Sequence, residues 1–475
     1  MLFNSLLFLF FFLIVYIIYH ISHQIYRKYI LLVSSMFFYA SWDFLNFENP
    51  IPLFFTHFLV VICTNYLCIL GIEKSKKQEF KKFFMVLSTL FNLSNLAFFK
   101  YFYFLFEIVS SITGNPEWHT NARANFQIIL PIAISFYSFQ IIAFVVDKYR
   151  GEIPEHTTFV EFSLFIFFFP QQLAGPILKA NEFFPRLHSP KEVTKEDVEI
   201  GLYYILLGVL KKGVFADSLA YAITPIFANP SQYNAMSLFL AIVGFLFQLW
   251  GDFAGYCDIA IGCGKLLGFD LPNNFNRPFY SVRFSEMWLR WHITLSRFLR
   301  DYIYFPMGGS KYGEFRTTFN SASTMVIAGI WHGANWNYIL WGVVIAISLI
   351  LERQVLDRFQ WWKQKSEGWD RFLKNCVILL FWLVLSIIFR ANQLSDIPIF
   401  LERIFSFSVG QKVKYDELVF IPIVMMVMQY YEYTPTMLIW IQKRFWVVAI
   451  STSVVLLFLL SELGNKQVQF IYFQF

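Results

Sequence analysis

Long apolar runs restrict the fold of this chain more than any other feature of its sequence. They cover residues 2–19, 29–46, 52–71, 83–105, 126–146, 157–178, 199–225, 234–268, 318–350, 371–390, 415–430 and 445–461. A helix of about 20 apolar residues matches the hydrocarbon layer of a membrane, and lipid leaves every backbone group to be paired inside the segment. We therefore expect an all-α polytopic membrane protein with roughly 9–12 transmembrane helices.

Composition and charge agree with this class. Hydrophobic residues make up 57% of the 475 residues and charged residues 15%, against about 25% charged in soluble proteins. The net charge of +6 is explained by basic loops at the cytoplasmic ends of spans, so no nucleic-acid partner is expected. The lysines of loop 73–82, together with Arg27, Lys28, Lys148 and Arg150, predict an extracytoplasmic N-terminus. Segment 2–19 lacks a basic start and a cleavage site, and we interpret it as a retained span.

The region 155–320 departs from simple spans. The apolar stretch 162–169 is followed at once by the Pro- and Gly-containing stretch 170–176, which predicts a re-entrant element buried in protein. Lys211 and Lys212 interrupt the next apolar segment, and we expect them to snorkel or to lie along the membrane interface.

Residues 284–302 have the pattern of one amphipathic helix, with aromatic and leucine residues at three- and four-residue steps. Glu286 with Arg290, and Arg297 with Asp301, are spaced as ion pairs on such a helix. Four arginines between 283 and 300 are too costly for the bilayer centre. The segment is therefore expected to be interfacial or re-entrant.

Two of the eight histidines lie where chemistry is plausible. His332 follows Trp331 within an apolar segment, with Gly329 and Gly333 permitting close backbone approach and Asn335 supplying an amide. An equally weighted alternative is a hydrogen-bonded core histidine that joins two helices. His292 lies on the amphipathic helix and, taken alone, is better explained as structural.

Together the two histidines suggest acid–base chemistry, since a buried imidazole stays neutral and accepts a proton near neutral pH. The sequence contains no GxSxG, Walker or HExxH motif, and no metal site is expected.

At these residues the sequence resembles the membrane-bound O-acyltransferase family. The stretches that carry the resemblance are Ile134-Ser-Phe-Tyr-Ser-Phe-Gln140, Gln172-Leu-Ala-Gly-Pro-Ile177, Gly268-Phe-Asp-Leu-Pro-Asn-Asn-Phe-Asn-Arg-Pro-Phe279, Arg290-Trp-His-Ile-Thr-Leu-Ser296, Arg300-Asp-Tyr-Ile-Tyr304, Pro306-Met-Gly-Gly309, Trp331-His-Gly-Ala-Asn-Trp336 and Phe389-Arg-Ala391. Within the family the chain is most similar to the alginate O-acetyltransferase branch. The D-alanyl transfer branch shares the two histidine elements.

The resemblance implies a fold and a set of site residues. The fold would be one membrane domain over residues 1–475, with spans and re-entrant helices around a central funnel, a core at about 126–391 and peripheral spans at both ends. His332 would be catalytic and His292 a second essential residue. Supporting roles, in positioning substrate or holding helices, would fall to Asn335, Trp331, Arg290, Asp301 and Gln172.

The implied activity is transfer of an acetyl group from a cytoplasmic thioester donor, such as acetyl-CoA, at the bacterial cytoplasmic membrane. The acceptor would be a hydroxyl of a cell-surface polysaccharide or an extracytoplasmic SGNH-type partner transferase that works with polysaccharide export machinery. No tightly bound cofactor is expected, and His332 would act as a general base or as an acyl carrier. The alternatives are a D-alanyl transferase fed by a carrier-protein thioester, and a transporter or channel with a histidine proton relay.

Overall fold

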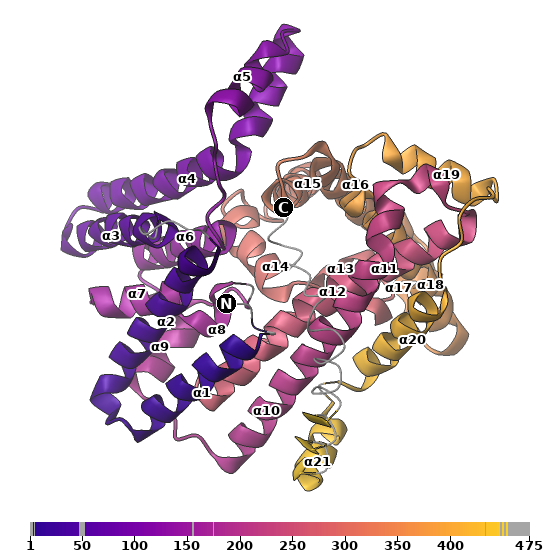
Figure 1. Ribbon diagram of the computed structural model, residues 1–475. Helices are drawn as coiled ribbons and strands as arrows, with labels where there is room; N and C mark the ends of the chain where they lie inside the picture. Colours follow the sequence, from indigo (N-terminus) through magenta and orange to yellow (C-terminus); the bar gives the residue numbers. More distant parts are fainter. Residues whose placement is uncertain are drawn as a thin grey trace. The chain divides into compact units, whose positions relative to one another are not determined.

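The computed structural model describes residues 3, 5–46, 53–153, 156–173, 175–432, 434–446, 449–450 and 453–454 (Figure 1). Within these residues the regular structure is helical, apart from one isolated bridge between Tyr233 and Gln411. The apolar run 445–461 lies mostly outside the described residues. The chain forms two compact units, one of residues 1–201 with 260–272 and the other of residues 202–259 with 273–475. Helix α10 (Lys195–Val209) passes from the first unit into the second, and α12 (Ala235–Leu266) returns.

The first unit is built from helices packed through phenylalanine. Its further helices are α1 (Leu6–Ile21), α2 (Gln24–Asn46), α3 (Leu53–Lys74), α4 (Gln78–Thr113), α5 (Glu117–Asn125), α6 (Ile134–Arg150), α7 (Phe159–Phe167), α8 (Phe169–Gln172) and α9 (Ala180–His188). Phe58 of α3 stacks on Tyr137 of α6 and contacts Phe167 of α7, each with ring centroids 4.3 Å apart. These three rings join three helices in one buried core.

A helix break is present in this unit, but it falls at Phe168, inside the apolar stretch 162–169 rather than after it, and Pro170 lies within the short helix α8. Helix α7 ends at Phe167, and Phe168 leaves the helical conformation before α8 begins. The side-chain amides of Gln140 and Gln171 donate to the carbonyl of Phe165 at 2.9 and 3.1 Å. Protein groups thus satisfy a carbonyl at the helix break, as a chain in an apolar environment requires.

The second unit contains the remaining elements. These are the π-helical turn η1 (Leu210–Ala216), α11 (Asp217–Ala228), η2 (Pro230–Gln232), η3 (Pro278–Tyr280), α13 (Phe284–Arg290), α14 (Ile293–Leu299), η4 (Arg300–Tyr304), α15 (Gly313–His332), α16 (Trp336–Gln354), η5 (Leu356–Arg358), α17 (Gln360–Lys363), α18 (Gly368–Arg390), α19 (Asp396–Phe405), α20 (Asp416–Tyr431) and α21 (Pro435–Lys443). Helices α15 and α16 form the most extensively packed pair and lie side by side (Figure 1).

Five described helical segments are long and apolar enough to cross a membrane: α3, α4, α12, the segment Trp336–Arg358 and α18. The apolar α1 is shorter. The all-α polytopic membrane fold predicted from the sequence is therefore confirmed, while the total of 9–12 spans stays a prediction. The spans differ in their surroundings, because the apolar window of α12 is 89% buried and that of α4 only 11%. Helix α12 is thus enclosed by protein.

The prediction that residues 284–302 form a single amphipathic helix is wrong. The segment is divided into α13, α14 and η4, and the break falls at His292, whose φ of 44° is left-handed. The amide of Ile293 donates to the carbonyl of Asn274 at 2.9 Å, and the amide of Asn276 donates to the carbonyl of Arg290 at 2.9 Å. The spacing of apolar residues predicted the helical parts of this segment. It did not predict the backbone hydrogen bonds with the loop that contains Asn274 and Asn276.

Lys211 and Lys212 do not snorkel, so that expectation is also wrong. Both lie on η1 and are at most 1% exposed. Glycine permits this, because a Cβ on Gly208 would come within 2.4 Å of the Gly255 carbonyl and one on Gly255 within 2.7 Å of the Gly208 carbonyl. Helices α10 and α12 therefore pack backbone against backbone beside η1, which holds the two lysines inside the protein.

Candidate active site around His332 and His292

His332 is the last residue of α15 and lies in an aromatic cage. Its ring meets Trp331, Trp341 and Phe389 edge to face, at centroid distances of 5.0, 4.9 and 5.2 Å. The imidazole is buried, with 4% of the residue exposed. The cage draws on α15, α16 and α18, so three helices fix its position.

Glycines bring α15 and α16 close enough to form this cage. A Cβ on Gly329 would lie 2.2 Å from the carbonyl oxygen of Tyr338, and one on Gly342 would lie 2.5 Å from that of Met325. A Cβ on Gly333 would strike the Tyr338 ring at 2.2 Å. Larger residues at these positions would force apart the two helices that carry His332 and Trp341.

His292 lies at the break between α13 and α14, outside the five candidate spans, and is 2% exposed. Its Nδ1 is 3.3 Å from Oδ1 of Asn274. That oxygen also accepts hydrogen bonds from the Thr294 amide at 3.1 Å and the Thr294 hydroxyl at 2.9 Å. Since Oδ1 acts as an acceptor, the network assigns the proton of His292 to Nδ1 and leaves a lone pair on Nε2.

The surroundings of His292 also determine its charge. Burial lowers the pKa of His292 to about 3, so the ring is neutral at physiological pH. No group in the described part of the chain forms a hydrogen bond with Nε2, which is buried. A neutral imidazole with an available buried nitrogen is suited to accept a proton from a bound hydroxyl.

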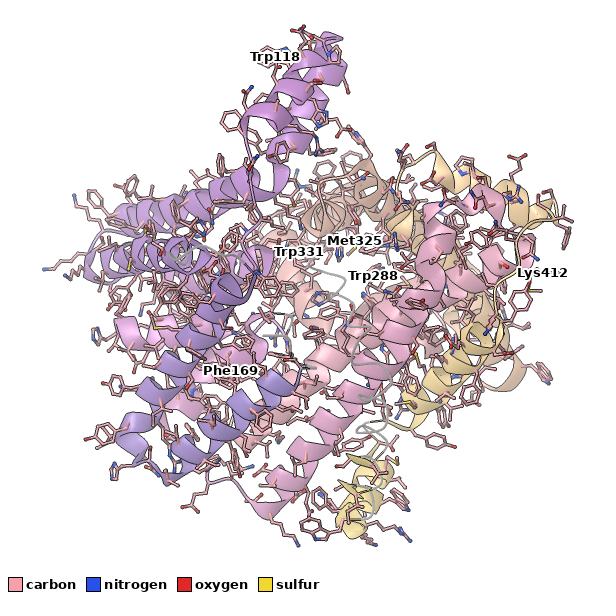
Figure 2. The ribbon with its side chains drawn as sticks, in the orientation of Figure 1. Trp118, Phe169, Trp288, Met325, Trp331 and Lys412 are labelled. Atoms are coloured by element: carbon pink, nitrogen blue, oxygen red, sulfur yellow. The ribbon has the colours of Figure 1, made fainter. Side chains whose placement is uncertain are left out.

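One indole touches both histidines. The Trp331 ring lies 5.9 Å from the His292 ring and 5.0 Å from the His332 ring. Trp288, labelled in Figure 2 together with Trp331, packs against Trp341 of the cage at an interplanar angle of 89° and a centroid distance of 5.5 Å. The structure thus brings together two histidines that are 40 positions apart in the sequence.

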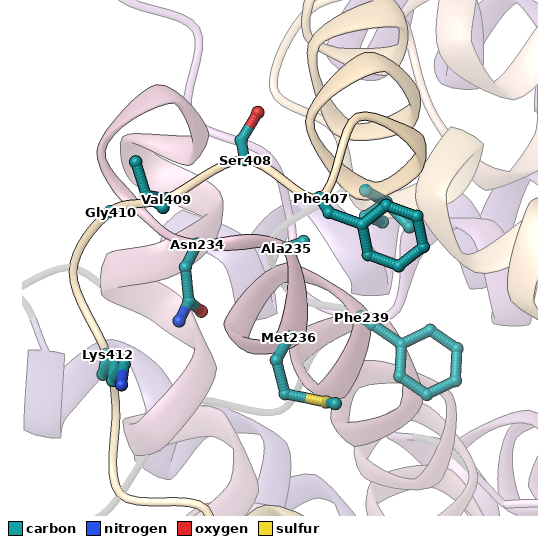
Figure 3. Close-up of a pocket in the computed structure, with 10 residues that line it drawn as sticks. Asn234, Ala235, Met236, Phe239, Phe407, Ser408, Val409, Gly410 and Lys412 are labelled. Atoms are coloured by element: carbon teal, nitrogen blue, oxygen red, sulfur yellow. The ribbon is translucent and has the colours of Figure 1, made fainter.

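A small cavity opens beside His332. It is bounded by Trp291, Trp341, Trp382, Ser386 and Phe389 together with Leu249, and its volume of about 10 Å³ suits a single water molecule. A larger cavity of about 410 Å³ lies between the start of α12 and residues 404–412 (Figure 3). Among the described residues that line the larger cavity, Lys412 carries the charge. His332 makes the smaller cavity the better candidate for chemistry.

The proposed supporting residues have different surroundings. Asn335 caps α16 by accepting from the Asn337 amide at 3.1 Å. Arg290 forms the predicted pair with Glu286 at 2.6 Å, and Asp301 pairs with Arg300 at 2.8 Å. Through these contacts Asn335, Arg290 and Asp301 stabilise helix ends and short helices.

Gln172 belongs to the first unit, where it ends α8 and is 4% exposed. Neither its side-chain oxygen nor its side-chain nitrogen has a hydrogen-bond partner among the described residues. A buried amide without a partner lowers stability unless it hydrogen-bonds with a ligand or a water molecule. A role for Gln172 along the substrate path therefore stays a prediction.

Several site residues were missed by sequence reasoning. Asn274 orients His292, Phe389 and Trp382 close the cavity, and Ser386 is its hydroxyl-bearing wall. Asn274 and Phe389 lie within the stretches that carry the family resemblance, so the sequence did contain a signal that could have marked them as site residues. Trp382 and Ser386 lie in an ordinary apolar run, where no pattern separates them from core residues.

Sequence reasoning also missed a buried ionic cluster, which we define as Lys211, Lys212 and the four carboxylates that they contact. The Lys211 ammonium lies 2.8 Å from Asp258 and 2.5 Å from Glu432, and that of Lys212 lies 2.6 Å from Asp217 and 2.7 Å from Asp252. All six side chains are at most 7% exposed. Each buried ammonium is therefore held between two carboxylates.

The two histidines are buried within a membrane-embedded helical fold, and comparison with known proteins shows the class of protein to which the fold belongs. The model of the MBOAT, or membrane-bound O-acyltransferase, family matches residues 36–395. The chain belongs to the membrane-bound O-acyltransferase family and is an acyltransferase.

Individual relatives agree with the family assignment. The chain is 34% identical to the probable alginate O-acetylase AlgI of Pseudomonas aeruginosa, over 86% of this chain and 76% of that protein. It is 31% identical to the peptidoglycan O-acetyltransferase of Helicobacter pylori, over 83% and 78% respectively. The teichoic acid D-alanyltransferase of Streptococcus thermophilus is 31% identical over 46% of this chain and 56% of its own length.

Proposed function

We propose that this protein transfers an acetyl group from acetyl-CoA, or a similar cytoplasmic thioester, to a hydroxyl group of a cell-surface polysaccharide. The observation that carries the proposal is the pair of buried histidines on the Trp331 ring, with the available Nε2 of His292. The names of the alginate and peptidoglycan relatives support acetyl as the acyl group and a glycan as the acceptor.

In the proposed reaction the acceptor hydroxyl loses its proton to a histidine as its oxygen attacks the thioester carbonyl. A C–O bond forms, the C–S bond of the donor breaks, and the proton moves from imidazole to the leaving thiolate. His332 borders the cavity and is proposed to contact the reacting groups directly, while Nε2 of His292 acts as the second proton acceptor. No bound cofactor is required, because the donor brings the activated acyl group.

The cavity beside His332 must widen for this reaction. Its volume of about 10 Å³ accommodates one water molecule but not an acetyl group. Trp382 and Ser386 on α18 and Trp341 on α16 line the cavity together. A movement of side chains between these two helices is therefore part of the proposal.

The setting of the reaction is proposed from the sequence. The basic loops favour an extracytoplasmic N-terminus in a bacterial cytoplasmic membrane, with the donor arriving from the cytoplasm. The product acetyl group would reach the polysaccharide directly or through an extracytoplasmic SGNH-type transferase that acts with the export machinery.

D-alanyl transfer is the second candidate, because a teichoic acid D-alanyltransferase matches about half of this chain. We prefer acetyl transfer, because the O-acetyltransferase relatives match more than four-fifths of this chain. A transporter with a histidine relay has no comparable support.

The test is transfer from radiolabelled acetyl-CoA in membranes that contain the wild-type chain, His332→Ala or His292→Ala, at matched expression. His156→Ala is the control, because that imidazole is 76% exposed. We expect labelled glycan or partner protein with the wild type and the control, and a loss of about 100-fold or more with His332→Ala. Equal labelling by His332→Ala would remove His332 from the mechanism, and labelling only from a D-alanyl carrier thioester would favour the second candidate.

A further inference from the structure

A second polar cavity, distinct from the histidine site, lies wholly within the first unit. Its volume is about 370 Å³, within the range of small-ligand sites. It is bounded by the end of α1, the first turns of α2, the last turn of α9 and Phe269. The charged groups on its wall are Arg27, Lys28, Arg186 and Glu161, and His188 adds an imidazole.

The carboxylates near this cavity are already occupied by other cations or by neutral donors. Arg186 pairs with Asp270 at 2.6 Å, and Asp270 also binds Lys265 at 2.6 Å. Glu161 lies 3.1 Å from His188 and accepts from the Thr158 amide at 2.9 Å. Each of these acidic groups therefore already has a partner other than Arg27 and Lys28.

Arg27 and Lys28 are the cations that lack an acidic partner. Both are half-buried, yet no described carboxylate lies within salt-bridge distance of either one. The Arg27 guanidinium lies 5.1 Å above the Tyr19 ring, and its Nε donates to the Ser22 carbonyl at 3.3 Å. Partly buried cations of this kind normally face an anion, so the cavity has the charge of an anion site.

The shape and surroundings of the cavity indicate the kind of anion. Ile25, Leu31 and Phe269 supply apolar wall beside the cations, which suits a charged group attached to a hydrocarbon chain. Arginine recognises phosphate oxygens through its planar fork, and lysine adds a point charge. Basic pockets between helices at the cytoplasmic end of a membrane protein commonly hold anionic lipid headgroups.

We propose that this cavity binds a phosphate ester, with the headgroup of an anionic phospholipid as the favoured source. Arg27 and Lys28 would bind the phosphate, Tyr19 would fix the guanidinium plane, and the apolar wall would take the start of an acyl chain. The phosphates of a nucleotide thioester offer the same chemistry, and that source alone rests on the proposed acetyl-CoA reaction. The lipid site does not depend on acetyl transfer.

The test measures lipid binding to the purified full-length protein in neutral detergent, by native mass spectrometry and by the shift of the melting temperature. The probes are phosphatidylglycerol and, as the uncharged comparison, phosphatidylcholine. The test variant is Arg27→Gln/Lys28→Gln. The matched control is Lys76→Gln/Lys77→Gln, which removes the same charge from two exposed lysines in another basic loop.

We expect phosphatidylglycerol to bind the wild type and the control alike, and to bind the test variant about thirtyfold more weakly. Arg27→Lys/Lys28→Arg keeps the charge and should retain binding, and the single substitutions replace the double variant if it does not fold. Equal binding of phosphatidylglycerol to all variants, or equal binding of both lipids to the wild type, would overturn the site.

The source of the phosphate is separated by competition. Coenzyme A and inorganic phosphate are each added to the wild type with bound phosphatidylglycerol. No displacement assigns the site to lipid, whereas displacement by coenzyme A assigns it to the nucleotide. Loss of acetyl transfer in His332→Ala without any change in lipid binding would show that the two proposals stand or fall separately.

Discussion

Helix α12 contributes to two buried polar regions of opposite character. Phe253 packs at 4.6 Å against the His292 ring on the side of the histidine site. The neighbouring Asp252 lies 2.7 Å from Lys212 and belongs to the ionic cluster. In the histidine site a neutral ring keeps a nitrogen available for a proton. In the ionic cluster each ammonium is held by two carboxylates.

This difference separates the region that we propose for chemistry from the region that we expect to stabilise the fold. A charge inside protein is tolerated when its partners are present, and removing one partner leaves the others uncompensated. A neutral histidine such as His292 makes no such demand, so its replacement should alter activity more than stability. Substitutions in the two regions therefore separate the two roles.

The largest effect is expected in the ionic cluster. Lys211→Met would leave Asp258 and Glu432 buried without their ammonium, and we expect a loss of about 3–5 kcal/mol in the free energy of unfolding. The measurement is the melting temperature in detergent together with the yield of monodisperse protein. Lys195→Met is the control, because that lysine is 86% exposed and its surface pair contributes little. A melting temperature for Lys211→Met equal to that of the control would contradict a structural role for the cluster.

The next effect should appear in activity alone. His292→Gln removes the basic nitrogen but keeps a polar side chain, and we expect acetyl transfer to fall by about 100-fold or more. The melting temperature should stay close to that of the wild type, in contrast to Lys211→Met. If His292→Gln lowered stability and activity together, the distinction between the two regions would fail and His292 would be a structural histidine.

The two regions also differ in how far the sequence could predict them. His332 could be selected as a candidate because it lies in an apolar run between glycines and tryptophans, a setting that is unusual for an ionisable residue. Lys211 and Lys212 are equally unusual in an apolar segment, but from the sequence alone snorkelling was a sufficient explanation. Their carboxylate partners could not be recognised, because they lie up to 221 positions away. Charge pairing across such distances depends on tertiary structure, which local pattern does not contain.

The same limit applies to the helix broken at His292. The three- and four-residue spacing of its apolar residues is helical on both sides of the break, and each piece is indeed a helix. The break depends on Asn274, which hydrogen-bonds with residues 293 and 294 from a loop 20 positions earlier. The sequence therefore predicted that His292 lies in a buried setting. It did not predict the backbone conformation at His292, which sets the direction of the two ring nitrogens.

Asn274 provides the next test, as a positioning residue. Asn274→Ala removes the acceptor that holds the proton on Nδ1 of His292, and we expect kcat to fall by about tenfold with KM little changed. Asn274→Asp keeps an acceptor at this position and should recover part of the rate. A merely structural residue would give equal losses in both variants, and that outcome would contradict the assigned tautomer.

The smallest effect is the dependence of stability on pH. Burial lowers the pKa of His292 to about 3, whereas in the unfolded chain it is about 6.5. Between these values the unfolded chain binds the proton and the folded protein does not, so stability should fall as the pH drops below about 6.5. Between about pH 7 and about pH 5.5 this contribution is about 1 kcal/mol.

The measurement is the melting temperature of the wild type and of His292→Gln at both pH values in the same detergent. We expect the decrease on acidification to be smaller in the variant, because glutamine binds no proton in either state. The ionic cluster should respond in the same way in both proteins, so the difference between them isolates His292. Identical decreases would mean that the pKa of His292 is the same in the folded protein as in the unfolded chain, which would contradict a lowering of that pKa by burial.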